Sequence, residues 1–356
     1  MSPGNGNQNG GRKGLLERLE AGPVICAEGY LFELERRGYL QAGGFVPEVV
    51  LEHPDVVRQL HEEFMRAGSD VVETLTYYGH REKLKVIGKE DLLEPLNRQA
   101  LQLAKEVAQE HDALFAGDIC NTNIFVDGDA DSAAAARAMF EEQVAWAVEA
   151  GVDFIVAETY SWGQEALIAV DVVKPTGLPI VVTLAIPQGE HTFEGWTAAE
   201  ACRRLEEAGA DVVGLNCLRG PATMLPLLRE IRDAVSIHVA GLPVPYRTTD
   251  AEQTFFSLTD PQLEGERAAR PFPDALDGLA CTRIEIADFG REAYDYGIAY
   301  IGVCCGAGPH HVRSLAEALG REPEASRYTA DMSKHAYLGT DPLVRREYKE
   351  DYGRRL

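Results

Sequence analysis

Two adjacent cysteines stand where an apolar run meets a glycine, in the stretch YIGVCCG that begins at Tyr300. Cys304 and Cys305 contribute nothing to the turn that normally ends a buried strand, because such turns are built from Gly, Asn or Asp. A third cysteine, Cys217, closes a similar run, VVGLNC. Three thiolates that meet around one borderline-soft cation form a zinc site with a fourth position left open, which is the pattern of a catalytic rather than a structural zinc.

The other cysteines show no such pattern. They are scattered singly, and the total of 7 is odd and lacks the regular spacing of a disulfide framework. We therefore expect reduced thiols and a cytoplasmic protein. Buried structural roles are expected for Cys26, Cys120, Cys202 and Cys281.

The cysteines can meet only if the fold brings their segments together, and the chain shows a regular alternation that would do so. Short runs rich in Val and Ile alternate with amphipathic segments that have helical spacing and a Gly near several ends. The eight runs cover residues 23–28, 70–77, 113–119, 153–159, 179–186, 211–217, 236–242 and 300–306. This alternation predicts an α/β fold, a closed (β/α)8 TIM barrel, with a doubly wound sheet as the alternative.

In a closed barrel the positions of the cysteines indicate a catalytic role, because the catalytic groups of such barrels lie where the carboxyl ends of the strands converge. Cys217 ends the sixth run, and Cys304 and Cys305 end the eighth, two strands apart around the ring. Their sulfur atoms are then within reach of one Zn2+. The open position would take a substrate thiol, whose pKa zinc lowers so that it binds as a thiolate nucleophile.

Three segments fall outside the alternation. Residues 1–20 begin with a Gly- and Asn-rich stretch and predict a disordered lead without a signal peptide. The catalytic barrel is expected over 21–320, interrupted by a polar excursion over 243–284 that could cover the barrel mouth. The tail over 321–356 cannot add to a closed barrel, so we expect a C-terminal arm that packs on another subunit of a homo-oligomer.

The composition narrows the possible partners. The chain has 356 residues, 45% hydrophobic and 26% charged, which is enough for a large core. Its 34 basic and 57 acidic side chains give a net charge of -23, which would repel nucleic acid and anionic membrane surfaces. No apolar stretch has the length of a membrane span. We expect small-molecule substrates and neither a nucleic acid nor a membrane partner.

The predicted strand ends carry further candidates for substrate binding, namely Glu28, Asp118, Glu158 and Asn216. Glu158 follows the apolar run DFIVA, where an unpaired carboxylate would be costly to bury. It either meets a cation, such as a substrate amino group, or pairs with a neighbouring barrel residue. Aromatic ring faces suit a quaternary ammonium or sulfonium ion. Those in or near the mouth loops are Phe45, Tyr77, Tyr78, Tyr160 and Trp162.

These residues carry a family resemblance. VVGLNC, followed further along the chain by YIGVCCGAGPHHVRSLAEAL, resembles the zinc signature of the homocysteine S-methyltransferase family. The stretches LFELERRGYLQAG and DMSKHAYLGTDPLVR are similar to the betaine-dependent members of that family. The resemblance covers nearly the whole chain from Pro23 onward.

The resemblance implies zinc-dependent transfer of a methyl group from a betaine-like onium donor to the thiol of homocysteine, giving methionine. It implies Cys217, Cys304 and Cys305 as the Zn2+ ligands. It also implies that Glu158 holds the amino group of homocysteine and that Tyr78 lies at the donor site.

Two departures from the family pattern leave the substrates open. Phe45 stands where the betaine enzymes have a tryptophan, which keeps an aromatic face with less surface. At the first strand, the family's Asp-Gly-Gly type turn reads CAEG, so that only Gly29 is retained and Ala27 removes the acid. Glu28 either replaces that acid from the adjacent position or reshapes the pocket. A sulfonium donor or a different acceptor thiol is therefore the alternative.

Two other classes of function remain. The stretch GAGPHH could open a helix whose N-terminus holds a phosphate, as in barrels of the aldolase or isomerase type. Against that class, no lysine lies at the predicted strand ends, and the thiols would have no role. A non-catalytic zinc-binding barrel is the other class, and turnover with homocysteine and a methyl donor separates it from an enzyme.

Overall fold

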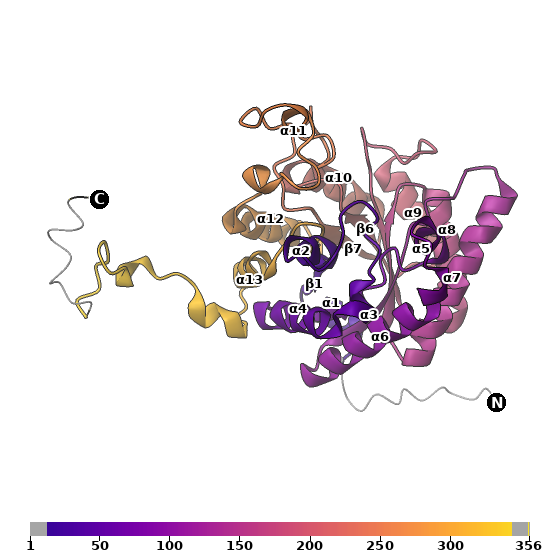
Figure 1. Ribbon diagram of the computed structural model, residues 1–356, viewed down its shortest axis with the longest axis horizontal. Coiled ribbons are helices and arrows are strands. Elements are labelled where there is room, and N and C mark those ends of the chain that lie inside the picture. Colours follow the sequence, from indigo (N-terminus) through magenta and orange to yellow (C-terminus); the bar gives the residue numbers. More distant parts are fainter. Residues whose placement is uncertain (1–12, 344–354, 356) are drawn as a thin grey trace.

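The computed structural model describes residues 13–343 and 355 (Figure 1). In this part of the chain eight parallel strands form one sheet in the order β1-β8-β7-β6-β5-β4-β3-β2. The strands are β1 Val24–Ala27, β2 Val71–Glu73, β3 Leu114–Cys120, β4 Phe154–Tyr160, β5 Ile180–Leu184, β6 Val212–Asn216, β7 His238–Leu242 and β8 Tyr300–Val303. Each coincides with one of the predicted apolar runs, and the (β/α)8 barrel is confirmed.

The ring closes between β1 and β2 through a small set of hydrogen bonds. The Asp70 N–H donates to the Ile25 carbonyl at 2.8 Å, and the Ile25 N–H donates to the Asp70 carboxylate at 2.7 Å. Arg321 pairs with the same carboxylate at 2.5 Å. The start of the C-terminal segment is thereby fixed to the bottom of the barrel, at the end opposite the cysteines.

Helices alternate with the strands, and most of them cover the outside of the ring (Figure 1). They are α1 Leu15–Ala21, α2 Tyr30–Arg36, α3 Val49–Glu52, α4 Pro54–Ala67, α5 Arg81–Val86, α6 Leu93–Glu110, α7 Ala130–Ala150, α8 Gly163–Val173, α9 Ala198–Ala208, α10 Pro221–Ala234, α11 Glu266–Ala269, α12 Arg283–Asp295 and α13 Pro309–Ala318. Their ends follow local chemistry. The helix α7 begins where the Asp129 side chain accepts the Asp131 N–H, and it ends at Gly151 with φ of 80°. Within the described segments, no helix has both the length and the apolar character needed to cross a membrane.

Apolar side chains fill two layers. One lies inside the ring, where Phe154 and Tyr300 meet edge to face, and the other lies between the strands and the surrounding helices. The helix α1 closes the bottom of the inner layer with Leu15 and Leu19. The expected disordered lead over 1–20 is therefore wrong for its last residues, because two buried leucines order them. Residues 1–12 lie outside the described part of the chain.

The long connection between β7 and β8 forms a lobe that includes α11 (orange in Figure 1). An isolated bridge between Tyr246 and Ala280 closes its base. Its aromatic side chains, among them Phe255 and Phe272, belong to one apolar cluster with Cys217 and Cys304. The lobe thus contributes a wall to the region where the cysteines meet.

The segment after α13 runs away from the barrel (yellow in Figure 1). It has short 3₁₀ turns, η4 Glu324–Tyr328 and η5 Met332–Lys334, and Arg66 of α4 pairs with Glu324 at 3.3 Å. Tyr328 and Leu338 are largely exposed. A role for this arm in assembly stays a prediction, and most of residues 344–356 lie outside the described part.

Candidate functional site

The three cysteines meet at the mouth of the barrel. Cys217 follows the end of β6, and Cys304 and Cys305 follow the end of β8. Their sulfur atoms all lie within 4.8 Å of one another, and those of Cys304 and Cys305 are 3.9 Å apart. A tetrahedral zinc with Zn–S bonds of about 2.3 Å places two sulfurs about 3.8 Å apart. This cysteine cluster therefore fits a three-thiolate zinc site with little movement of the sulfurs.

The backbone around the cluster is strained. Cys217 and Leu218 have φ of 54° and 55°, and Phe45, Tyr78 and Thr159 have φ of 49°, 59° and 65°. A non-glycine residue in this left-handed region costs roughly 1–3 kcal/mol, and such residues gather at functional sites. All five lie in loops or strand ends at the mouth. The surrounding fold must therefore hold their backbone in this unfavourable conformation, which fixes the directions of their side chains.

Two cavities adjoin the cysteine cluster. The large cavity has a volume of about 1210 Å³ and is lined by Cys217 and Cys305 together with side chains of many mouth loops. The small cavity has a volume of about 20 Å³ and is lined by Cys304 and Cys305 together with buried acids. Because ordinary ligand pockets measure about 300–1,000 Å³, the large cavity has room for two small substrates side by side.

Asn216 joins the ends of β1, β4 and β6. Its Oδ1 accepts the Thr159 N–H at 3.0 Å, and its Nδ2 donates to Glu28 Oε2 at 3.1 Å and to Glu158 Oε2. Burial raises the pKa of Glu158 to about 8 and raises the pKa of Glu28 well above its usual value. Both carboxylates have an oxygen within 4.8 Å of the Cys304 sulfur. A cationic group placed between them would keep both acids ionised.

Gly29 is the one glycine of the predicted site, and its role is close packing. A Cβ atom at this position would collide with the carbonyl oxygen of Ala307. The missing side chain lets the loop after β1 approach the loop after β8. Glu28 is thereby held next to Cys304.

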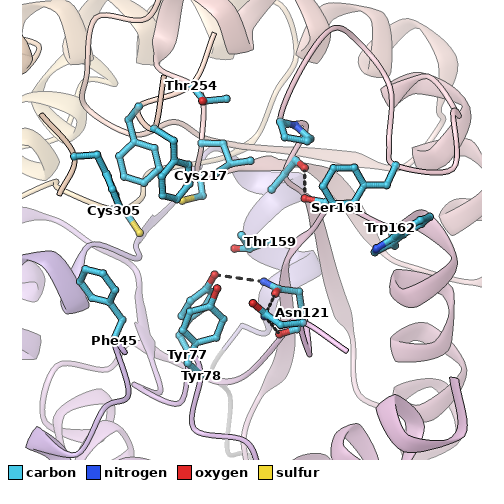
Figure 2. A pocket seen from close by; sticks show the side chains of 18 of the residues that line it. Phe45, Tyr77, Tyr78, Asn121, Thr159, Ser161, Trp162, Cys217, Thr254 and Cys305 are labelled. Atoms are coloured by element: carbon cyan, nitrogen blue, oxygen red, sulfur yellow. Dashed lines mark hydrogen bonds between the residues drawn. The ribbon is translucent and has the colours of Figure 1, made fainter. Parts of the chain in front are cut away.

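Aromatic rings form one side of the large cavity. Figure 2 shows Phe45, Tyr77 and Tyr78 gathered around the space beside Cys305. The two tyrosine rings have centroids 4.3 Å apart, and Phe45 stacks on Phe32 at 5.0 Å. The predicted gathering of aromatic faces next to the thiols is present in the structure for these three residues.

The other two predicted aromatic residues, Trp162 and Tyr160, differ in position: the first lies at the large cavity and the second does not. Trp162 lines the far side of the large cavity and contacts Phe193, with ring centroids 5.3 Å apart (Figure 2). The placement of Tyr160 at the mouth is wrong, because its ring is fully buried against Phe140 outside the barrel. The β4–β5 register shifts between Ala157 and Tyr160, and Thr159 in the left-handed region turns Tyr160 outward.

Sequence reasoning missed Lys83, a half-buried side chain of α5 that lines the large cavity. Its Nζ lies 3.8 Å from the centroid of the Tyr78 ring, and its pKa is lowered by burial. Among the described residues it forms no ion pair with an acid. Because Lys83 belongs to a helix after β2 rather than to a strand end, only its nearness to Tyr78 in the sequence could have indicated it.

Other missed residues lie in the lobe and in the small cavity. Phe255 and Phe272 of the lobe line the large cavity, but an excursion without periodicity gave no sign of which residues face inward. Glu73 lines the small cavity with the predicted Asp118. A glutamate inside the apolar run DVVETLTY was the available signal for Glu73.

The N-terminus of α13, considered as a phosphate site, is capped by its own chain. The Gly308 N–H donates to Nδ1 of His311 at 3.1 Å, and the His311 ring is buried with its pKa lowered to about 4 by that burial. A neutral ring thus occupies the position that an anion would need. This feature of the structure favours neither the aldolase nor the isomerase alternative.

Comparisons with known proteins agree with this geometry. The family profile described as Homocysteine S-methyltransferase matches residues 25–319. Betaine–homocysteine S-methyltransferase 1 of Xenopus tropicalis is 38% identical over 365 residues, which cover 98% of this chain and 86% of that protein. S-methylmethionine–homocysteine S-methyltransferase BHMT2 of Pongo abelii is 36% identical over 359 residues, covering 98% and 93%. The metallated form of the homocysteine methyltransferase MmuM from Escherichia coli has the same fold, with a TM-score of 0.66, 17% identity, and coverage of 84% of this chain and 97% of that one.

Proposed function

This chain belongs to the homocysteine S-methyltransferase family, and from that premise we propose that it transfers a methyl group from a betaine-like onium donor to the thiol of homocysteine, giving methionine. The observation that carries the proposal is the cysteine cluster, in which three sulfurs from two strand ends lie within 4.8 Å at the edge of a large cavity. No general acid is required, because the donor leaves as a neutral amine.

Cys217, Cys304 and Cys305 would hold Zn2+ in this reaction. All three sulfurs are soft donors, and no fourth protein ligand belongs to their group among the described residues. A zinc ion there would lower the pKa of the acceptor thiol and keep it as a thiolate. Asn216 lies directly behind the cluster, with Nδ2 3.9 Å from the Cys304 sulfur, and would fix the orientation of that ligand.

The acceptor would bind between the cysteine cluster and the buried acids. Glu158 and Glu28 lie next to Cys304 and offer carboxylates to the ammonium group of homocysteine. Glu28 would thus supply an acid from the position adjacent to Ala27. The strained backbone at Thr159, near the end of β4, and the Asn216 side chain hold the two carboxylates beside each other.

The donor would occupy the large cavity beside the aromatic rings. The faces of Phe45, Tyr77 and Tyr78 attract a methylated cation, and the positive charge of Lys83 on the same wall attracts an anionic group. A donor with a free carboxylate, such as glycine betaine, matches this pair of features. In the transfer, the C–S bond forms on the thiolate as the C–N bond breaks, so that the methyl group moves without its bonding electrons and dimethylglycine leaves with the electron pair. Positioning of this kind can lower a barrier by about 7–11 kcal/mol.

A panel assay tests the proposal. Homocysteine is offered with glycine betaine, dimethylsulfoniopropionate and S-methylmethionine, and methionine is measured. We expect the highest turnover with glycine betaine. Formation of methionine only from a sulfonium would change the donor, and no methionine from any donor would overturn the assignment.

Zinc content gives an independent arm of the test. The purified protein should contain about one zinc per chain, and Cys217→Ser, Cys304→Ser or Cys305→Ser should each lose most of it. Cys202→Ser is the matched control, because Cys202 is a buried cysteine in α9 within the outer apolar layer. Full zinc in all three variants would contradict the proposed ligand set.

A further inference from the structure

The large cavity extends well beyond the rings assigned to the methyl donor. Phe45, Tyr77 and Tyr78 belong to the loops after β1 and β2, whereas Trp162, in the loop after β4, lies on the other side (Figure 2). The volume of about 1210 Å³ exceeds the roughly 300–1,000 Å³ that suffices for a drug-sized ligand. Glycine betaine and homocysteine are both much smaller than that. Part of the cavity therefore has no substrate group assigned to it.

Three aromatic rings line this part of the cavity, which we call the far pocket. Phe125, Trp162 and Phe193 come from the loops after β3, β4 and β5. The ring centroids of Phe125 and Trp162 are 5.9 Å apart and those of Trp162 and Phe193 are 5.3 Å apart, both with the rings edge to face. Trp162 is half-buried and Phe193 is 58% exposed. Their uncovered faces suit an aromatic group, which would bind by offset stacking and edge contacts.

Amide side chains connect the far pocket to the donor rings. Asn123 Nδ2 donates to Asn121 Oδ1, and Asn121 Nδ2 donates to the Tyr77 hydroxyl at 3.4 Å. Figure 2 shows Asn121 and Thr159 between Tyr77 and Trp162. All of these residues line the same cavity. A single molecule can therefore contact the donor rings and the far pocket at the same time.

The far pocket extends the site of the donor rather than that of the acceptor. The acids proposed to anchor the acceptor, Glu28 and Glu158, line the small cavity and do not belong to the described lining of the large one. The donor carboxylate is proposed to meet Lys83, which lies over the Tyr78 ring. In a betaine, the carboxylate and the onium nitrogen are bonded to the same carbon. With both of these groups held at the donor rings, a further substituent on that carbon can extend toward the far pocket.

We propose that the far pocket binds an aromatic side chain of the methyl donor, so that the preferred donor is the N,N,N-trimethyl derivative of an aromatic amino acid. This inference rests on the proposed function and names the donor class within it. The trimethylammonium group lies against the face of Tyr78, the carboxylate meets Lys83, and the ring packs among the three rings of the far pocket. In the transfer, the C–S bond forms on the thiolate as the C–N bond breaks, and the N,N-dimethyl amino acid leaves with the electron pair.

Steady-state kinetics on the zinc-loaded, full-length protein test this inference. Glycine betaine, N,N,N-trimethylphenylalanine and N,N,N-trimethylleucine are compared at saturating homocysteine. We expect kcat/KM for trimethylphenylalanine to exceed that for glycine betaine at least about tenfold, and that for trimethylleucine about threefold or more, because only the phenyl ring matches the far pocket. Glycine betaine would overturn the inference if its kcat/KM were equal or higher. Equal use of trimethylleucine would contradict an aromatic occupant.

Substitution of Phe193 locates the effect in the far pocket. Its exposed ring is no part of the core, so Phe193→Ala should fold as the wild type does. This variant should lose at least about tenfold in kcat/KM for trimethylphenylalanine and nothing for glycine betaine, and Phe193→Tyr should recover the loss. Tyr294→Ala is the matched control, because Tyr294 is 40% exposed on α12 and does not line the large cavity. An equal loss with both donors in Phe193→Ala would overturn the inference.

Calorimetric binding separates this inference from the proposed function. Methionine from glycine betaine without a preference for trimethylphenylalanine would leave the proposed function standing and overturn only the far pocket. If no donor yields methionine, the proposed function fails, and the affinities for the same donors still test the far pocket. Trimethylphenylalanine that binds at least about tenfold more tightly than glycine betaine, with the difference lost in Phe193→Ala, would then support it. Equal affinities would overturn it.

Discussion

Replacing Lys83 by glutamine tests how the large cavity selects its methyl donor. Lys83 is half-buried, lines this cavity, and carries its charge 3.8 Å from the Tyr78 ring centroid. If the donor is a betaine, its onium group lies against the aromatic faces and its carboxylate meets Lys83. Lys83→Gln keeps most of the side chain's length and removes the charge.

The expected magnitude follows from the partial burial of this charge. Two unit charges 4 Å apart attract by about 4 kcal/mol at the effective dielectric of a protein surface, and solvent reduces this figure for a half-exposed group. Hydrogen bonds to charged groups contribute about 1.5–3 kcal/mol net. At about 1.4 kcal/mol for each factor of ten, kcat/KM for glycine betaine should fall by roughly 10- to 100-fold.

The assay varies glycine betaine at saturating homocysteine. The KM for homocysteine and the zinc content should stay unchanged, and Lys83→Arg should recover most of the lost kcat/KM. Lys85→Gln is the matched control, because Lys85 lies on the same helix, is 64% exposed, and faces Glu82 at 3.7 Å outside the cavity. Trimethylsulfonium, an onium ion without a carboxylate, should be used no worse by Lys83→Gln than by the wild type.

Two results would contradict a contact between Lys83 and the donor carboxylate. One is an unchanged kcat/KM for glycine betaine in Lys83→Gln. The other is an equal loss with trimethylsulfonium, which would mean that Lys83 supports the site without contacting a donor carboxylate.

Further predictions concern the donor site, pH and assembly. Tyr78→Ala should weaken the binding of onium donors by up to about 2 kcal/mol and leave the zinc content unchanged. Donor kinetics identical to those of the wild type would exclude a cation–π role for Tyr78. His61 is buried without a hydrogen-bond partner among the described residues, and burial lowers its pKa from 6.5 to about 3. The unfolded chain therefore takes up the proton first, and the free energy of unfolding falls as the pH drops below 6.5, by about 2 kcal/mol at pH 5 from this group. Urea titrations should show a smaller loss between pH 7 and pH 5 in His61→Leu, and an equal loss would contradict that origin. Light scattering should give a homo-oligomer for the full chain and a smaller mass for a chain that ends at residue 330; a monomeric full chain would remove the role proposed for the arm.

The barrel and the meeting of the cysteines followed from the sequence because both depend on strong periodic signals. Eight apolar runs separated by amphipathic segments fix a ring, and a ring places Cys217 near Cys304 whatever the loops do. The same argument placed Glu28, Asp118, Glu158 and Asn216 at the strand ends. These predictions needed only the alternation of elements and the residue at each carboxyl end.

The orientation of Tyr160 could not be predicted from the sequence, because it depends on single backbone angles. Tyr160 is two residues after Glu158, so strict alternation would direct both side chains into the barrel. The register shift before Tyr160 and the φ of 65° at Thr159 break that alternation, and Tyr160 packs outward on Phe140. A shift of this kind has no sequence signature in the run DFIVAET.

Long-range packing decided the remaining differences. Phe255 and Phe272 reach the site only because the lobe after β7 folds back over it. Leu15 and Leu19 are ordered by the bottom of the barrel, although the polar residues before them resemble a disordered lead. Lys83 is placed in the cavity by the direction of a short helix, which periodicity over so few residues cannot fix.

The most direct test of the central claim is X-ray absorption at the zinc edge, recorded on the purified enzyme before and after homocysteine is added. We expect three sulfur neighbours at about 2.3 Å in the free enzyme, supplied by Cys217, Cys304 and Cys305, and a fourth sulfur when homocysteine binds. Fewer than three sulfurs at the start, or a sulfur shell that homocysteine leaves unchanged, would contradict it.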